Sequence, residues 1–306
     1  MMKTLSEIAK EKAKKQPHQI DEILEEAPVL ARLKFEEATH DFHNVAEEVT
    51  DVTGATWVPM NGVLPTVDAV TNLRKVDLAI MGGEIEVPED TAKVFGGKDS
   101  YFAKKLPKVH KKTGMDTERR IIYDNWKRYA IANKMAKKTD AASGAGYSII
   151  AVRLVSGEHN GLYSPSGFNQ GTMLNVMALN GGNLYKSISD KYKGVNVYGI
   201  RLKAYLGWQI LNNRTCAAIV NIQPDKLPTA MQIDDMLADI RATDSGNTML
   251  IMHPKCRNLL GGFKESKLMM SVGEKNFSQQ LMNWNGIPIL TTYNMDDGTE
   301  PFVTIA

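Results

Sequence analysis

With only two cysteines in 306 residues, this chain lacks the material for a disulfide framework or a cysteine-based metal site. Cys216 and Cys256 lie 40 residues apart in the sequence, and we expect both to be small buried thiols in a reducing cytoplasm. No apolar run approaches the roughly 18 residues needed to cross a bilayer. The lysine-bearing N-terminus also has no apolar stretch of the kind found in a secretory signal. The sequence therefore predicts no membrane contact and synthesis in a cytoplasm.

Net charge is nearly absent as well, because 37 Lys and Arg oppose 35 Asp and Glu. A protein that grips polyphosphate along its surface would carry far more positive charge. Residues 104–138 depart from this balance with twelve Lys or Arg and only three Asp or Glu. This excess predicts either a solvated helix face or a helix near an acidic partner or DNA phosphate. The acidic stretches 21–26 and 36–51 offer such a partner, which favours contact between copies of the chain.

Residue clusters typical of catalysis are scarce. His40 and His43 have no third ligand at a suitable spacing, so a solvated or hydrogen-bonding pair is favoured over a metal site. His253 and Cys256 fall at a predicted strand-to-helix junction without an oxyanion-forming glycine turn. The glycines of SGAG (143–146) close a predicted helix and lack the lysine of a phosphate loop. We therefore predict no catalytic residue, no metal site, no cofactor and no enzymatic activity.

Hydrophobic periodicity predicts an α+β chain. The expected helices cover 4–15, 18–37 with a kink or a split at Pro28, about 98–138 with breaks near Pro107 and Gly114, and 228–242. The expected strands cover 147–155, 161–165, two stretches within 195–222, 248–254 and 287–295.

Residues 44–66 are typical of an extended β-ribbon. Val, Thr and Trp are frequent there, and Gly54 and the Asn61-Gly62 pair are turn signals. Further along, Gly82-Gly83 suits a bulge or bend. The ribbon has too few apolar residues to form a core, and an isolated two-stranded ribbon is marginally stable in water. Something outside the ribbon is therefore expected to cover it.

The order of these parts resembles that of a tailed-bacteriophage major capsid protein, a family whose fold was first described for the phage Hong Kong 97. The resemblance covers nearly the whole chain, and its specificity lies in the order and spacing of the pieces. The pieces that carry it are TLSEIAK, IDEILEEAPVLARLKFEEA, TGATWVPMNGVLPT, YGIRLKAYLGWQILNNRTCAAIVNI and NWNGIPILTTYNM.

The resemblance implies the Hong Kong 97-like major capsid fold in four parts. These are an N-terminal arm (1–38), an extended loop (39–75), a mainly peripheral domain (76–225) with its spine helix at about 98–138, and a mainly axial domain with the C-terminal strand (226–306).

The resemblance also implies that the neighbouring subunit covers the ribbon, which would lie across the next copy's spine helix. The expected contacts in the loop are Val52, Trp57, Val58 and Pro59. Those in the arm are Ile23, Leu24, Leu30 and Leu33, and the spine helix contributes Ile122, Trp126 and Tyr129. The loop has no lysine from 39 to 74, so we expect no lysine–asparagine crosslink of the founding member's kind. With 38 residues ahead of the ribbon, we also expect no large propeptide.

The function implied is that of a non-enzymatic structural subunit. Copies would form hexamers and pentamers in the host bacterial cytoplasm and close into an icosahedral virion head around double-stranded DNA, which they would bind without sequence specificity. A separate scaffolding protein, a portal and a decoration protein are the other partners of this class. Two alternatives stay open: an encapsulin-like compartment, which resembles the same fold but packages enzymes, and a soluble α/β enzyme that uses the glycines at 143–146.

Overall fold

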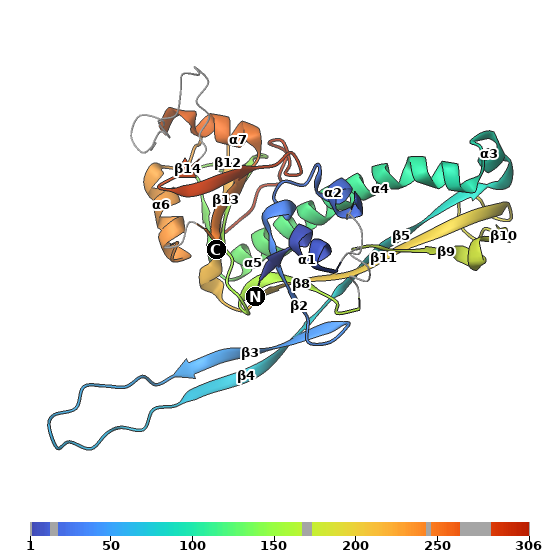
Figure 1. Cartoon of the computed structure of the whole chain (residues 1–306). Helices are drawn as coiled ribbons and strands as arrows, with labels where there is room; N and C mark the ends of the chain where they lie inside the picture. Colours follow the sequence, from blue (N-terminus) through green and yellow to red (C-terminus); the bar gives the residue numbers. More distant parts are fainter. Residues whose placement is uncertain (1, 13–17, 167–172, 243–245, 264–282, 306) are drawn as a thin grey trace, which may run out of the picture.

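The computed structural model describes residues 2–12, 18–166, 173–242, 246–263 and 283–305. The chain is an elongated α+β molecule in which a long helix runs beside a long sheet. A second sheet lies at one end of that helix, and a two-stranded hairpin projects from the body (Figure 1).

The larger sheet has seven strands and forms the long body of the molecule. Its strands are β1 (Lys3–Thr4), β2 (Lys34–Glu37), β8 (His159–Tyr163), β11 (Asn196–Ile210) and β10 (Tyr185–Lys186), with β5 (Ala79–Pro88) and β9 (Asn175–Ala178) also paired to β11. β2 and β8 are parallel, and the other pairs are antiparallel. Largely alternating burial along β11 gives the sheet one face that packs on the core.

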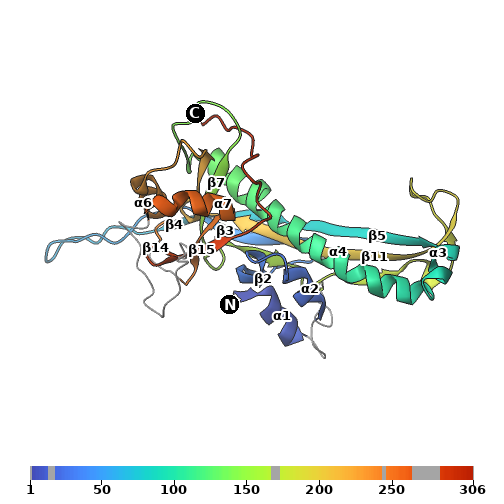
Figure 2. The ribbon, with the colours of Figure 1, turned by 90° about the horizontal axis from the view of Figure 1, so that it is seen from above.

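The spine is one continuous helix. It consists of α4 (Lys98–Arg120), a π-helical stretch (Ile121–Lys127) and α5 (Arg128–Ala132), preceded by the short α3 (Glu89–Val94). Figure 2 shows it running along β5 and β11. The predicted breaks near Pro107 and Gly114 are wrong, because both residues lie inside α4. Gly114 is needed for packing, since a Cβ there would lie 1.9 Å from the carbonyl oxygen of Ile23 in α2.

The spine also ends earlier than 138. Lys134 adopts a φ of 58°, which a helix cannot continue through, and Ala136–Lys138 forms strand β6. The stretch 143–146 therefore follows a strand and precedes another, so the prediction that it closes the helix is wrong.

The hairpin consists of β3 (His43–Val52) and β4 (Ala69–Asp77), which pair only with each other within the described chain. Its tip, 53–68, closes in a turn in which Gly62 N donates to Pro59 O at 2.8 Å. β4 leads into β5 after the single residue Leu78, so the hairpin grows directly out of the long sheet.

The predicted bulge at Gly82-Gly83 is wrong, because β5 pairs with β11 without a register shift. Gly82 instead allows close approach, since a Cβ there would lie 2.3 Å from the Leu202 carbonyl oxygen.

The N-terminal region packs against the spine. It contains α1 (Leu5–Lys12), α2 (His18–Leu24) and a 3-10 turn (Leu30–Arg32). The helix predicted over 18–37, kinked or split at Pro28, is wrong beyond α2, because the α-helix ends at Leu24 and Lys34–Glu37 joins the sheet as β2. The Phe35 ring occupies the space above Gly161, where a Cβ would lie 2.2 Å from it. That close fit holds β2 against β8.

The second sheet has six strands in the order β14 (Asn283–Trp284), β15 (Ile287–Thr291), β13 (Thr248–Met252), β7 (Tyr147–Arg153), β12 (Cys216–Ile222) and β6. Helices α6 (Ala230–Asp239) and α7 (Pro254–Leu259) accompany it, and Ile233, Met236 and Cys256 share a core cluster with its strands. Short 3-10 turns lie at Leu179–Gly182, Asn213–Thr215 and Leu260–Phe263. The sheet takes strands from both sides of residue 225, so a domain boundary there cuts through it.

Candidate functional site

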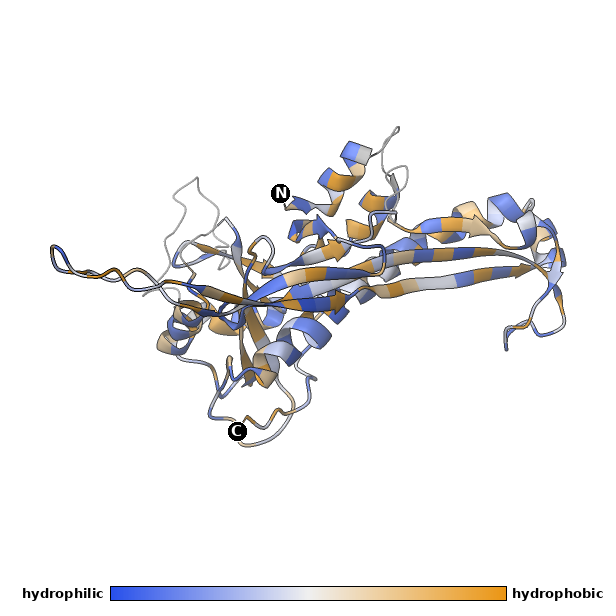
Figure 3. Ribbon diagram, turned by 90° about the horizontal axis from the view of Figure 1, so that it is seen from below, coloured by the Kyte–Doolittle hydropathy of each residue, from blue (hydrophilic) through white to orange (hydrophobic). Residues whose placement is uncertain are grey.

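The hairpin tip exposes a concentration of large apolar side chains. Trp57 is fully exposed at 104 % and Met60 is exposed at 95 %. Val52, Val63, Leu64, Val67, Val70 and Leu73 are exposed on the same element. Single exposed apolar residues are ordinary on soluble proteins, but a run of them on one projecting element indicates a surface that another molecule covers. Figure 3 shows the hairpin extending away from the body, with hydrophobic and hydrophilic stretches along it.

The four loop residues predicted as contacts all lie on this hairpin. Val52, Trp57 and Pro59 are exposed, while Val58 is half-buried beside the turn at Gly62. The structure therefore leaves three of these four side chains free for contact with another molecule.

The hairpin divides into a charge-free tip and an acidic shank. Residues 53–67 contain no Asp, Glu, Lys or Arg, whereas the whole of 43–77 contains five carboxylates and two cations. Arg74 lies 3.3 Å from Glu48, and Lys75 lies 3.0 Å from Asp77. Glu47, Asp51 and Asp68 remain exposed, so the shank presents negative charge to solvent.

A polar network fixes the hairpin to the long sheet. Asn44 Nδ2 donates to Gln209 Oε1 at 2.8 Å, and Gln209 Nε2 donates to Asn160 Oδ1 at 2.8 Å. Asn160 Nδ2 in turn donates to Glu36 Oε2 at 3.0 Å. Because Asn44, Asn160 and Gln209 are all buried, these bonds are shielded from competing water and hold the root of the hairpin in one orientation.

The four arm residues lie in the core of their own chain. Ile23, Leu30 and Leu33 are fully buried, and Leu24 packs partly buried against the same cluster. Their packing is complete within one subunit, so in this conformation they offer no surface to a neighbour. The spine residues likewise face inward, because Ile122 and Trp126 are fully buried and Tyr129 is half-buried.

The acidic stretch 21–26 pairs with the spine of the same chain rather than with another copy. Lys111 Nζ lies 2.7 Å from Glu25 Oε1, and His110 Nδ1 lies 2.7 Å from Glu22 Oε2. These carboxylates therefore already have partners on the spine of their own chain. Closer to the start of the spine, Lys104, Lys105 and Lys108 are exposed.

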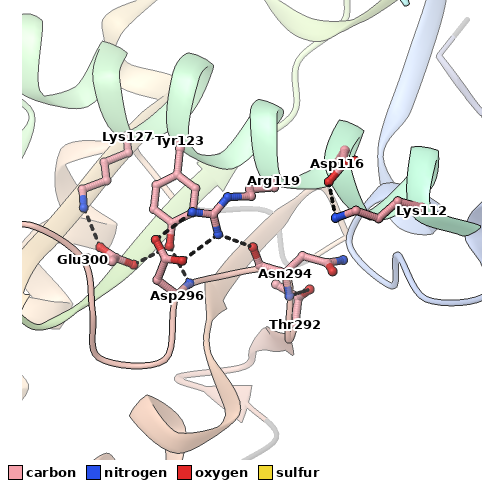
Figure 4. A network of polar contacts seen from close by, with 9 residues as sticks. All are labelled: Lys112, Asp116, Arg119, Tyr123, Lys127, Thr292, Asn294, Asp296 and Glu300. Carbon is pink, nitrogen blue, oxygen red and sulfur yellow. Dashed lines mark hydrogen bonds and ion pairs between the residues drawn. The ribbon is translucent and has the colours of Figure 1, made fainter. Parts of the chain in front are cut away.

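The far end of the spine is tied to the C-terminal segment (Figure 4). Arg119 makes two parallel bonds to the Asp296 carboxylate, at 2.7 and 2.8 Å. Lys127 Nζ and Tyr123 OH both donate to the buried Glu300, at 2.5 and 2.7 Å. Burial, followed by the Glu300 charge, raises the pKa of the Tyr123 hydroxyl, so it stays a donor. These contacts are structural and hold the spine in the body.

Glu118 is a fully buried carboxylate at the junction of spine, arm and C-terminal strand. Its Oε2 accepts from the backbone N–H groups of Val29 and Leu30, each at 2.9 Å. Its Oε1 accepts from Thr292 Oγ1 and, at 2.9 Å, from Asn294 Nδ2. Burial raises the pKa of this carboxyl, while the four donors oppose that shift.

The groups considered for chemistry occupy structural positions. His253 Nδ1 accepts from Lys255 N at 3.2 Å and caps α7. Burial raises the pKa of the Cys256 thiol to about 12, so it is not a thiolate nucleophile at neutral pH. At 143–146 the carbonyl groups of Ser143 and Ala145 accept from Gln223 Nε2, at 2.7 and 3.2 Å. A phosphate loop needs backbone N–H groups turned toward the ligand.

Two further features concern metals and membranes. The rings of His40 and His43 stack with centroids 4.4 Å apart, and no group of three or more His, Cys, Asp or Glu in the described part of the chain is placed to hold a metal ion. Among those residues, none of the helices combines the length and hydrophobicity that a bilayer crossing requires.

No protein-family model matches the sequence, and no curated protein matches it. Its structure, however, is similar to solved structures. A chain from the structure of bacteriophage Epsilon15 is 12% identical with a TM-score of 0.57, and 87% of each chain is covered. The bacteriophage JBD30 capsid is 8% identical with a TM-score of 0.51, covering 85% of this chain and 88% of that one. The encapsulin complex of Synechococcus elongatus is 12% identical over 66% of this chain and 90% of that one, and its TM-score of 0.45 is too low to argue a shared fold.

The two stronger likenesses show the fold. The chain has the Hong Kong 97-like capsid fold seen in tailed-phage capsid proteins, with its projecting hairpin, spine helix and two sheets. The fold class implied by the resemblance in the sequence is therefore confirmed.

Proposed function

We propose that this protein is the structural subunit of a tailed-phage head, a closed icosahedral shell of hexamers and pentamers that encloses double-stranded DNA. The observation that carries the proposal is the hairpin, which projects a fully exposed Trp57 and a charge-free apolar tip that its own chain leaves uncovered. An element of this kind gains its stability when a neighbouring copy buries it. The fold supports the same reading.

In this proposal the chain acts by packing and performs no chemistry. Val52, Trp57, Val58 and Pro59 contribute to the contact between neighbouring subunits, and the exposed carboxylates of the shank face the lysines at the start of a neighbour's spine helix. Opposite charges of this kind orient an encounter and fix its register more than they add affinity. The long sheet with the spine serves as the peripheral domain, and the six-stranded sheet with α6 and α7 serves as the axial domain.

Electron microscopy and a hairpin deletion test the proposal. The intact chain should form closed shells, visible by negative stain and by sedimentation, whereas a chain without residues 50–62 should fold but form none. Circular dichroism and thermal unfolding of the shortened chain provide the control for folding. Normal shells from the shortened chain would contradict the role given to the hairpin. A chain that stays monomeric at every concentration would contradict the shell itself.

The content of the shell is a separate question with its own measurement. Particles purified from producing cells should contain nuclease-resistant double-stranded DNA. Particles that instead hold a discrete protein cargo and no DNA would mean a compartment rather than a phage head.

A further inference from the structure

The outer edge of β5 is an open strand edge. β5 pairs with β11 along all ten of its residues, and no other described strand pairs with it. Figure 2 shows β5 along the outer side of the sheet, beside the spine helix. Alternate backbone N–H and C=O groups of such a strand point away from the sheet and are available to an additional strand.

An apolar groove lies next to this open edge, between β5 and the spine. It has a volume of about 520 Å³ and is lined mainly by apolar side chains, among them Ile80, Ile85, Val109, Leu202, Leu206 and Trp208. Four charged residues, Asp77, Glu84, Asp116 and Arg120, line it as well. The indole N–H of Trp208 is shielded from solvent and has no acceptor among the described residues. At Gly83, which also lines the groove, an added Cβ would meet nothing within 4 Å.

These features together fit an extended segment of polypeptide. Its backbone would complete the ladder on β5, and every second side chain would point into the groove. The occupant should be largely apolar and uncharged where it crosses the groove, since burying an unpaired charge there would be costly.

One segment of the chain has these properties. Residues 53–58 at the start of the hairpin tip are uncharged and free of proline, and beyond the bond from Thr53 N to Asp68 O they belong to no strand of the described chain. The opposite leg contains Pro65, which cannot donate to a ladder. Residues 53–58 number six, one fewer than 79–85, the part of β5 that lines the groove. The hairpin tip projects away from β5 and the groove beside it, so within this chain the tip does not reach them and a second copy has to make the contact (Figure 1).

We propose that residues 53–58 of one copy add as a strand to the free edge of β5 in a neighbouring copy, with Trp57 seated over the groove that Trp208 lines. The inference rests on the proposed shell function and specifies the surface that receives the hairpin. It also places the acidic shank, with Glu47 and Asp51, beside the spine helix that carries Lys104 and Lys108.

Thiol crosslinking tests the contact. The double variant Ala55→Cys/Gly83→Cys places one thiol on the hairpin, on the same strand face as Trp57, and one on the β5 edge, where Gly83 has room for a side chain. Ala55→Cys/Lys138→Cys is the matched control, because Lys138 lies exposed on the edge strand β6 of the other sheet. The native Cys216 and Cys256 are buried and give little background. A short bis-maleimide links the two thiols, and its length allows for a strand pairing that differs by one residue from the one proposed.

Assembled Ala55→Cys/Gly83→Cys should give a ladder of covalent multimers on denaturing gels, and the control should stay monomeric. Closed shells without that ladder would overturn this contact and leave the shell function standing. Absence of shells from the unmodified chain would overturn the shell function, and this contact with it.

Hydrogen exchange on the unmodified chain gives a second measurement that needs no variant. Amides in both 53–58 and 79–85 should become protected when free subunits assemble into shells. Unchanged exchange in 79–85 would overturn the contact, even where the cysteine variants fail to assemble.

Discussion

Replacing Trp57 with alanine should raise the concentration needed for shell assembly and leave the stability of the free subunit unchanged. The side chain is fully exposed in the isolated chain, so the substitution removes no contact within the subunit. Any loss must therefore come from contacts between subunits. This separation makes Trp57 the sharpest single test of the proposed interface.

The size of the effect follows from the area of the side chain. A tryptophan buries about 150–250 Å² at about 25 cal/mol per Å², which gives about 4–6 kcal/mol for complete burial. Ordering the side chain and desolvating its neighbours reduce this, and aromatic interface residues commonly cost about 2–4 kcal/mol on truncation. Since 1.4 kcal/mol is a factor of ten in an equilibrium constant, the critical concentration should rise at least about 30-fold.

Light scattering over a dilution series measures the critical concentration, and urea unfolding of dilute subunits measures the free energy of unfolding. Trp57→Phe keeps most of the aromatic area, so we expect only a few-fold increase. Met231→Ala is a matched control, because Met231 is also exposed but lies on α6, away from the hairpin. An unchanged assembly threshold for Trp57→Ala would refute the reasoning. So would a fall in subunit stability of more than about 0.5 kcal/mol, which exceeds what an exposed site gives.

Three further predictions concern the fold, each measured by urea unfolding. Gly114→Ala should destabilise by about 1–3 kcal/mol, because its Cβ would meet the backbone of α2, whereas Gly83→Ala has open space and should change little. Lys127→Met should cost about 3–5 kcal/mol by leaving Glu300 buried and unpaired, and adding Glu300→Gln should recover much of that loss. Burial raises the pKa of Glu118, so the folded chain holds this proton more tightly than the unfolded chain. The stability of the natural chain relative to Glu118→Gln should therefore be greatest below about pH 4.3 and decline as pH rises through the folded pKa. A Gly114→Ala chain as stable as the natural chain would contradict the first expectation, and a Lys127→Met chain of unchanged stability would contradict the second. The third would be contradicted if the stability difference between the natural chain and Glu118→Gln did not depend on pH.

Elements governed by local pattern were predictable from the sequence. The buried strands within 147–155 and 195–222 and the amphipathic helix within 228–242 have periodicities that their surroundings reinforce. Lys34–Glu37 has no such pattern, and its strand conformation depends on pairing with β8 more than 120 residues away. The spine runs through Pro107 for a similar reason, because packing of its buried face outweighs a poor local residue.

The candidate site was only half predictable. The hairpin shows in the sequence because an uncharged stretch with Trp57 between turn residues is unusual. The β5 edge and its groove do not show, because residues from β5, the spine and β11 meet there only through the fold. From the sequence alone, Glu118 would be predicted to lie on the surface, because it stands beside Arg119 and Arg120. It is buried as a hydrogen-bond acceptor instead, and its donors Leu30 and Thr292 are 88 and 174 residues away in the sequence. Contacts at such separations leave no local periodicity.

The connection between hairpin and sheet has a consequence for assembly. β4 and β5 are joined through one residue, Leu78, so the element that would reach a neighbour and the edge that would receive one belong to nearly the same strand. A contact between these two different surfaces is heterologous, and such contacts continue from copy to copy until they close a ring. The angle between successive copies then depends on the angle at which the hairpin leaves the sheet. The buried bonds from Asn44 to Gln209 and from Gln209 to Asn160 fix that angle within each subunit. Because the root is ordered before any partner arrives, little conformational freedom is lost on association. The number of copies in a closed ring therefore depends more on the root of the hairpin than on its tip.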